Sequence, residues 1–319
     1  MFKKKKIVIF GGNGFLGLPL VKKLLQKKSY LILVVDLKKP NAFFKKNPKV
    51  KYIKYDVTKI SELKLATLIK NSYAIFYKIA LLGNPEFSTD NTKVWNYLSI
   101  NSLFFWKLIN VAKKSNVKKI IVDSSVTAIS DFTLKSPMDE TTVPLVPTNF
   151  YGLSKAILED ISRFCITNNI IDIKILRYPR VYSSEQNNFI MNFSKKIIHN
   201  KSLKIFDHFY KIVDLIHLDD AVEMSYKILN YNGTKKIFHA SYNNPLTLIQ
   251  IIKKITKKLN IDNLKIEKSN IFKSPREPLL SSLKNTFSSK ELKIKFNYNI
   301  EKIIDDAVQF NLKDNMNKK

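Results

Sequence analysis

The feature that most constrains the fold is a glycine-rich turn near the start of this 319-residue chain. Residues 7–17 read IVIFGGNGFLG, so glycines at 11, 14 and 17 follow directly on four apolar residues. Ile7–Phe10 and Leu31–Val35 are short runs rich in β-branched residues, and Leu16–Lys27 between them has the apolar spacing of a helix. The order strand, glycine turn, helix, strand predicts a βαβ unit with two parallel strands.

The glycine spacing predicts that this turn binds a dinucleotide. Glycine lets the backbone turn sharply and approach a pyrophosphate, and the N-terminus of the next helix offers free N–H groups to the anion. Asp36 ends the second strand, where a carboxylate accepts hydrogen bonds from ribose hydroxyls and repels a 2′-phosphate. This favours NAD over NADP, although Lys38 and Lys39 soften the repulsion. Asp56 is expected either to hydrogen-bond the adenine or to be a plain turn aspartate. The alternative to a dinucleotide site is a glycine-rich turn that binds no ligand.

The rest of the chain alternates between strand-like and helix-like segments. Further strands are expected at Tyr73–Ala80, Lys119–Val122 and Asp172–Arg177, with long helices at Val94–Lys113 and Tyr151–Asn168. This alternation predicts an α/β fold of the Rossmann type, with a doubly wound parallel sheet over residues 1–180. The looser pattern beyond 180 predicts a smaller C-terminal α/β substrate lobe from 181–212 and 242–312. The segment 213–241 would return to the sheet, and 313–319 would be a frayed tail.

Composition narrows the class of protein further. Only four of the 55 basic residues are arginine, and the lysines are spread along the chain, so the net charge of +29 indicates a solvated surface more than a nucleic-acid site.

Cys165 is the single cysteine, which rules out an internal disulfide and favours a reducing, cytoplasmic location. No apolar run is long enough to span a bilayer. The glycine turn interrupts the apolar run after the first lysines, which argues against a secretory signal. No clustered His and Cys ligands are seen, so no metal is expected.

A tyrosine, a lysine and a serine are the candidate catalytic groups. Tyr151 and Lys155 stand four apart at a helix start and share one face, but the same spacing recurs at three other tyrosines, so spacing alone decides nothing. Their position decides it. Ser124 and Ser125 close the preceding strand, at the carboxyl edge where a parallel sheet binds ligands.

These segments together resemble an extended short-chain dehydrogenase/reductase of the NAD-dependent epimerase/dehydratase family. The matching segments are GGNGFLG (11–17), Asp36, Asn101, SSVTAIS (124–130), YGLSK (151–155), LRYPRVY (176–182) and DLIHLDD (214–220). The resemblance implies that Tyr151 is the acid/base and that Lys155 favours its tyrosinate and binds the nicotinamide ribose. It implies that Ser125 holds the substrate oxygen, with Ser124 as the fallback, and that Asn101 supports a proton relay. The alternative for Asn101 is an asparagine that caps or kinks its helix. The NAD contacts it implies are Gly11, Asn13, Gly14, Phe15, Leu16, Gly17, Asp36, Asp56, Val57, Ile79, Ala80, Lys155, Tyr178 and Val181.

The residues after the catalytic serine bear on the reaction. Sugar dehydratases and decarboxylases of the family carry acidic residues at the positions of Val126 and Thr127. Their absence argues against dehydration and decarboxylation and leaves an epimerase or a ketoreductase as the expected enzyme. A nucleotide-sugar is the expected substrate, contacted by Ser125 and Tyr151, with Lys211 and Arg276 on the diphosphate. Val213 stands where many members have an arginine, which keeps a non-nucleotide ketone open as substrate. The high net charge leaves open a second hypothesis, in which the protein has the same fold without catalytic activity and binds RNA or a protein complex.

The resemblance also suggests a homodimer through the two long helices. Their apolar residues form either the subunit interface or the core, and those considered are Phe104, Phe105, Trp106, Ile157, Leu158 and Ile161.

Overall fold

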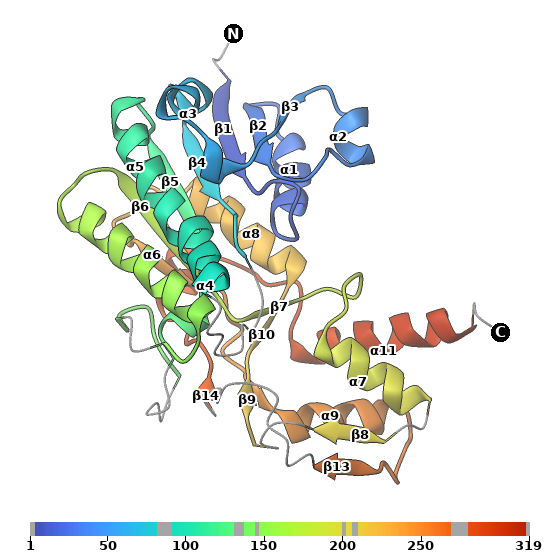
Figure 1. Cartoon of the computed structure of the whole chain (residues 1–319). Helices are drawn as coiled ribbons and strands as arrows, with labels where there is room; N and C mark the ends of the chain where they lie inside the picture. The colour runs from blue at the N-terminus through green and yellow to red at the C-terminus, as the bar shows by residue number, and fades with distance from the viewer. Residues whose placement is uncertain are drawn as a thin grey trace.

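A computed structural model describes residues 4–81, 91–130, 137–143, 147–199, 202–205, 210–268 and 280–316. In this part of the chain a seven-stranded sheet forms the centre of the larger lobe, and all its neighbouring strands run parallel (Figure 1). Its strands in spatial order are β11 (Ile237–His239), β6 (Asp172–Tyr178), β5 (Lys119–Ser125), β4 (Ala74–Tyr77), β1 (Lys5–Phe10), β2 (Tyr30–Asp36) and β3 (Val50–Lys54). The order reverses between β1 and β4, as expected for a doubly wound fold.

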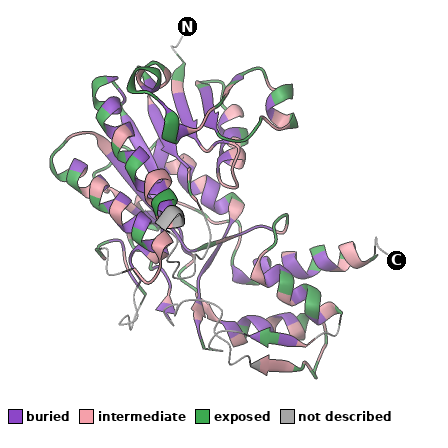
Figure 2. Ribbon diagram, in the orientation of Figure 1, coloured by how far each residue is buried: buried purple, intermediate pink, exposed green. Residues whose placement is uncertain are grey.

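Helices cover both faces of this sheet, because successive side chains of a strand point to opposite sides. Ile7 and Ile9 of β1 pack in one core with α1 (Gly17–Leu25) and α8 (Leu218–Leu229). Val8 and Phe10 pack in the other core with α3 (Glu62–Ile69), α5 (Phe104–Lys114) and α6 (Phe150–Thr167). Figure 2 shows that the inner strands are largely buried, that the edge strand β3 is partly exposed, and that the helices are exposed on their outer sides. The predicted doubly wound parallel sheet is therefore confirmed.

The smaller lobe packs around a third core from the C-terminal half of the chain. Its helices are α7 (Phe189–Ile198), α9 (Leu248–Lys258) and α11 (Ile300–Met316). The tail expected to be frayed begins at residue 313, but α11 continues as far as Met316. Its strands are β8 (Leu203–Ile205), β9 (Ile212–Val213), β12 (Leu246–Thr247), β13 (Ile266–Lys268) and β14 (Leu280–Ser281). β7 (Arg180–Tyr182) and β10 (Leu215–His217) pair in parallel where the chain crosses between lobes. Short helices α2 (Ala42–Lys46) and α10 (Phe287–Leu292) complete the larger lobe.

The first long helix differs from the sequence expectation. Val94–Lys113 was expected as one helix, but α4 (Asn91–Leu98) is joined to α5 by a π-helical stretch, Ser99–Leu103. Such stretches widen a helix locally and often accompany functional sites. Asn101 lies in this stretch.

The apolar residues of the two long helices divide between core and surface. Phe104, Phe105 and Leu158 are buried in the core of the larger lobe, so an interface role for these three is wrong. Trp106 keeps 40% of its surface exposed, and Ile157 and Ile161 are half-buried. Within the described residues, no helix has the length and apolar character needed to cross a membrane.

Candidate active site

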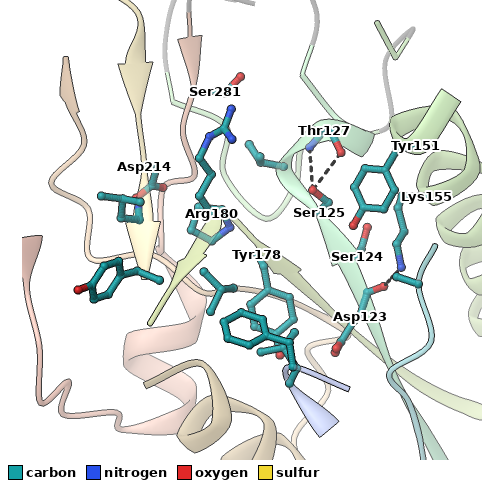
Figure 3. Close-up of a pocket in the computed structure, with 18 of the residues that line it drawn as sticks. Asp123, Ser124, Ser125, Thr127, Tyr151, Lys155, Tyr178, Arg180, Asp214 and Ser281 are labelled. Atoms are coloured by element: carbon teal, nitrogen blue, oxygen red, sulfur yellow. Dashed lines mark hydrogen bonds between the residues drawn. The ribbon is translucent and has the colours of Figure 1, made fainter. Parts of the chain in front are cut away.

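A cavity of about 840 Å³ opens at the carboxyl edge of the sheet, between the two lobes (Figure 3). The glycine turn, the ends of β4, β5 and β6, and the start of α6 form its walls on the larger lobe. The segment Lys211–Leu215 and Ser281 close it on the smaller lobe. A site of this size at the switch point of a parallel sheet can hold a dinucleotide and a second ligand side by side.

The glycine turn has the tight geometry that only glycine allows. Gly11 has a φ of +82°, in the left-handed region, and a Cβ there would lie 2.7 Å from the Lys78 carbonyl oxygen. A Cβ at Gly17 would lie 2.1 Å from the Gly11 carbonyl oxygen, so α1 can start at this point only without a side chain. Leu16, at the N-cap of α1, provides no side-chain hydrogen bond, and Gly14 and Leu16 line the cavity. The turn therefore presents the start of a helix to an anion.

The two aspartates expected at the adenosine end have different surroundings. Asp36 accepts hydrogen bonds from the backbone N–H groups of Asn13 (2.9 Å) and Lys38 (3.0 Å), one on each oxygen. Each oxygen keeps a lone pair for a ribose hydroxyl, so the carboxylate both fixes the turn and stays available. Asp56 accepts from the backbone N–H (3.0 Å) and the hydroxyl (2.7 Å) of Thr58, which is the geometry of a turn aspartate.

The expected cofactor residues fall into two groups around the cavity. Those that line it are Gly14, Phe15, Leu16, Ile79, Ala80, Lys155, Tyr178 and Val181. Those set back from the lining are Gly11, Asn13, Gly17, Asp36, Asp56 and Val57.

The expected substrate residues are placed in part. Ser125, Tyr151 and Lys211 line the cavity, and Lys211 is buried. Arg276 lies outside the described residues.

The candidate catalytic groups meet on one wall of the cavity. Tyr151 stands in the first turn of α6, which Asn149 caps by accepting from the Gly152 N–H at 2.7 Å. Its side chain shares a hydrogen bond with Ser125, and burial raises its pKa above the ordinary value. Lys155 follows one turn later, with Nζ 5.9 Å from the centre of the Tyr151 ring. Burial lowers the pKa of Lys155 to about 8.

Asn101 connects the site to its surroundings without lining the cavity. Its side-chain oxygen accepts from the Leu81 N–H at 2.8 Å, and its amide donates to Ser154 Oγ at 2.9 Å. Ser154 in turn donates to the carbonyl oxygen of Tyr151 at 2.8 Å. Asn101 therefore braces the loop after β4 against the helix that carries Tyr151 and Lys155.

Sequence reasoning missed a buried network behind Ser124. Ser124 Oγ donates to Glu159 Oε1 at 2.5 Å, and Glu159 also accepts from Arg177 Nη2 at 2.6 Å. The side chains of Glu159 and Arg177 have no exposed surface, and Arg177 Nη1 lies 3.2 Å from His239 Nε2. The available signal was the spacing of Glu159. It comes four residues after Lys155, so both side chains lie on the same face of the helix, and Glu159 is predicted to face the sheet as well.

Sequence reasoning did not predict the pairing of two further charged groups at the strand ends. Lys78 and Asp123 form a buried ion pair, with Lys78 Nζ 2.6 Å from Asp123 Oδ1. The signal was a lysine directly after one apolar strand and an aspartate near the end of another, at the same edge of the sheet. Arg180, from β7, extends into the cavity opposite Tyr151 and Ser125 (Figure 3). Asp214 accepts from the Leu283 N–H at 3.0 Å across the lobes, and burial raises its pKa to about 7.

The fold and this site define a class: a Rossmann-type short-chain dehydrogenase/reductase, with a glycine turn, a serine, and a tyrosine four residues before a lysine. The sequence profile of the NAD dependent epimerase/dehydratase family matches residues 7–241. The chain belongs to this family, which confirms the resemblance drawn from the motifs.

Individual relatives agree with this assignment. The chain is 25% identical over 238 residues to a putative UDP-glucose 4-epimerase of Methanocaldococcus jannaschii, covering 71% of this chain and 74% of that protein. It is 21% identical over 283 residues to protein CapI of Staphylococcus aureus, covering 80% of this chain and 83% of that protein. Its fold is similar to UDP-glucuronic acid 4-epimerase of Bacillus cereus in complex with UDP-glucuronic acid and NAD. That match has a TM-score of 0.81 and 19% identity, over 97% of this chain and 99% of the other.

Proposed function

We propose that the protein is an NAD-dependent nucleotide-sugar epimerase that acts at a hydroxyl-bearing carbon of the sugar. The observation that carries the proposal is the meeting of Ser125, Tyr151 and Lys155 on one wall of a cavity that the glycine turn also enters. The relatives that carry 4-epimerase names, and the structures that contain UDP-sugars and NAD, support the substrate class.

The residues around the glycine turn fit NAD. Gly14, Phe15 and Leu16 line the cavity at the start of α1, where a pyrophosphate would accept hydrogen bonds from backbone N–H groups. Asp36 would hold the adenosine ribose and disfavour a 2′-phosphate, and Lys155 would hold the nicotinamide ribose. When bound, NAD supplies reversible hydride transfer at the sugar carbon.

The protein groups move the proton that accompanies this transfer. Tyr151 takes the proton of the sugar hydroxyl and later returns it, while Ser125 holds the same oxygen in place. Burial raises the pKa of Tyr151, the nearby Asp123 carboxylate adds to this rise, and the hydrogen bond with Ser125 opposes it. The ammonium of Lys155 is the group that we propose stabilises the tyrosinate during the reaction. Val126 and Thr127, next to Ser125, carry no carboxylate, so the site lacks a second base there for dehydration.

Cations at the other end of the cavity suit the diphosphate of a nucleotide-sugar. Arg180 and Lys211 both line the cavity, on the side of the smaller lobe. Val213, also in the lining, replaces the arginine that many members carry, so these two are the described cations best placed for the diphosphate.

A panel of nucleotide-sugars tests the proposal. Purified protein is incubated with UDP-, GDP- and dTDP-sugars, with and without NAD, and the products are separated from their epimers by chromatography. Wild-type protein is expected to interconvert at least one epimer pair, and Tyr151→Phe to lose this activity. Consumption of NADH with a non-nucleotide ketone, and no epimer in any reaction, would assign a ketoreductase in its place.

A homodimer through α4, α5 and α6 is the quaternary structure that we propose. Trp95, Trp106 and Phe164 on these helices keep 61%, 40% and 55% of their surface exposed. Large apolar side chains gathered on neighbouring helices favour a partner surface. We also propose a cytoplasmic location, since the single cysteine, Cys165, is buried and unpaired.

A further inference from the structure

An ion pair with no assigned role lies directly behind the Tyr151–Lys155 pair. Lys78, just after β4, and Asp123, in β5, approach to 2.6 Å, and the Lys78 side chain has no exposed surface. Lys78 Nζ also donates to Ser225 Oγ at 2.8 Å and to the Tyr178 hydroxyl at 3.2 Å. All three ammonium protons thus have acceptors, so the site is built for the charged form of this lysine.

Asp123 also contacts the candidate catalytic lysine. Its backbone carbonyl accepts from Lys155 Nζ at 2.8 Å, the bond drawn as a dashed line in Figure 3. One residue therefore contacts two ammonium groups, with its carboxylate on Lys78 and its carbonyl on Lys155. Charges alternate along the row Lys78, Asp123, Lys155 and then Tyr151, whose reactive form is an anion.

Burial acts against every charge in this row. It lowers the pKa of Lys155 to about 8, and Asp123 is the strongest of the groups that oppose this, ahead of Glu159. Burial likewise raises the pKa of Asp123, and Lys78 is the strongest group that opposes that rise. Lys155 therefore depends on Asp123 for its proton, and Asp123 depends on Lys78 for its charge.

We propose that Asp123 and Lys78 are positioning residues for the reaction: Asp123 holds Lys155 in place and in its ammonium form, and Lys78 keeps Asp123 ionised. The inference rests on the proposed function, which gives the Lys155 ammonium its task beside Tyr151. Within the part of the chain that the structure describes, Tyr178 on β6, Ser225 on α8, Glu159 on α6 and Tyr97 on α4 also face the row.

The test measures the titration of Lys155 without substrate or cofactor. Acetylation of Lys155 by acetic anhydride is followed against pH by mass spectrometry of its peptide. The variants are Asp123→Asn, Lys78→Met, the double variant, and Ser225→Ala as a control that removes a neutral partner of Lys78. Asp123→Asn keeps the carbonyl that binds Lys155, so it removes charge and leaves that hydrogen bond.

We expect the Lys155 midpoint to fall by about one pH unit in Asp123→Asn. It should fall in the same direction in Lys78→Met, because the unpaired Asp123 then takes up a proton. The Lys155 midpoint should also fall in the double variant, and it should stay unchanged in Ser225→Ala. The double variant removes both charges of the Lys78–Asp123 ion pair, so neither stays buried without its partner, and it provides the measurement even if a single variant does not fold.

Three results would overturn the inference: an unmoved midpoint in the double variant, an equal shift in Ser225→Ala, or a rise in Lys78→Met. In parallel, the alkaline limb of the wild-type pH–activity profile should move down in Asp123→Asn by the same amount as the midpoint. If the midpoint shifts in the variants but wild type has no epimerase activity, the proposed function is refuted, and the control of the Lys155 charge by Asp123 and Lys78 still stands. If wild type interconverts epimers but the Lys155 midpoint does not move in the double variant, the proposed function stands and the inference is refuted.

Discussion

Replacing Glu159 with alanine tests whether the buried network behind Ser124 stabilises the larger lobe. Glu159 accepts three hydrogen bonds from Arg177, at 2.6, 2.9 and 3.2 Å, and a fourth from Ser124. Glu159→Ala would leave the Arg177 guanidinium buried, with the neutral ring of His239 as its remaining partner among these groups.

The magnitude follows from burial. Removing one partner of a fully buried ion pair costs about 3–5 kcal/mol, because the other charge stays without compensation. An exposed pair is worth about 0–1 kcal/mol. The next residue on the same helix, Asp160, is 68% exposed and pairs with Arg163 at 3.5 Å, so it provides a matched control.

Denaturant unfolding, followed by circular dichroism, measures both variants against wild type. The expected loss in free energy of unfolding is about 3–5 kcal/mol for Glu159→Ala. For Asp160→Ala it is below about 1 kcal/mol. Similar losses in the two variants would refute the reasoning, since they would show that burial of the Glu159–Arg177 pair does not set the cost.

Three further predictions concern the cofactor turn, the pH dependence of stability and the oligomer. Gly17→Ala is expected to weaken NAD binding at least tenfold in calorimetry, because its Cβ would lie 2.1 Å from the Gly11 carbonyl oxygen; equal affinity would contradict this. Burial, with Arg177 beside it, lowers the pKa of His239 to about 3 from the ordinary 6.5. The unfolded chain therefore binds the proton first as pH falls below 6.5, so this contribution to stability is complete above that pH and is lost toward pH 3. His239→Gln should show a shallower acid decline in free energy of unfolding than wild type. Trp106→Glu is expected to turn a dimer into a monomer in light scattering, and a wild-type monomer would contradict the proposed interface.

The sequence was most informative where one residue type has a single physical use. The glycines of residues 11–17 predicted the turn, and the structure shows why at Gly11 and Gly17, where any side chain would collide with backbone. The alternation of apolar runs and helical spacing predicted the doubly wound sheet, because parallel strands that are buried on both faces have nearly continuous apolar sequences.

Interactions between distant segments could not be predicted in the same way. Lys78 and Asp123 are 45 residues apart and meet only because β4 and β5 are neighbours in the sheet. The composition of Val94–Lys113 favours a continuous helix, whereas the structure has a π-helical stretch around Asn101, whose side chain bonds the distant Leu81 and Ser154. Phe104 and Phe105 are apolar in either environment, so their type alone did not separate core from interface.

The most direct test of the proposed function is the reduction of bound NAD by a sugar nucleotide in a single turnover. Protein saturated with NAD is mixed rapidly with each sugar nucleotide, and the fluorescence of the reduced nicotinamide is recorded. Calorimetry first establishes that wild type and Tyr151→Phe bind NAD equally. Transient reduction in wild type, with at least a hundredfold slower reduction in Tyr151→Phe, is the expected result. Equal rates in the two proteins would contradict the role of Tyr151 as the acid/base.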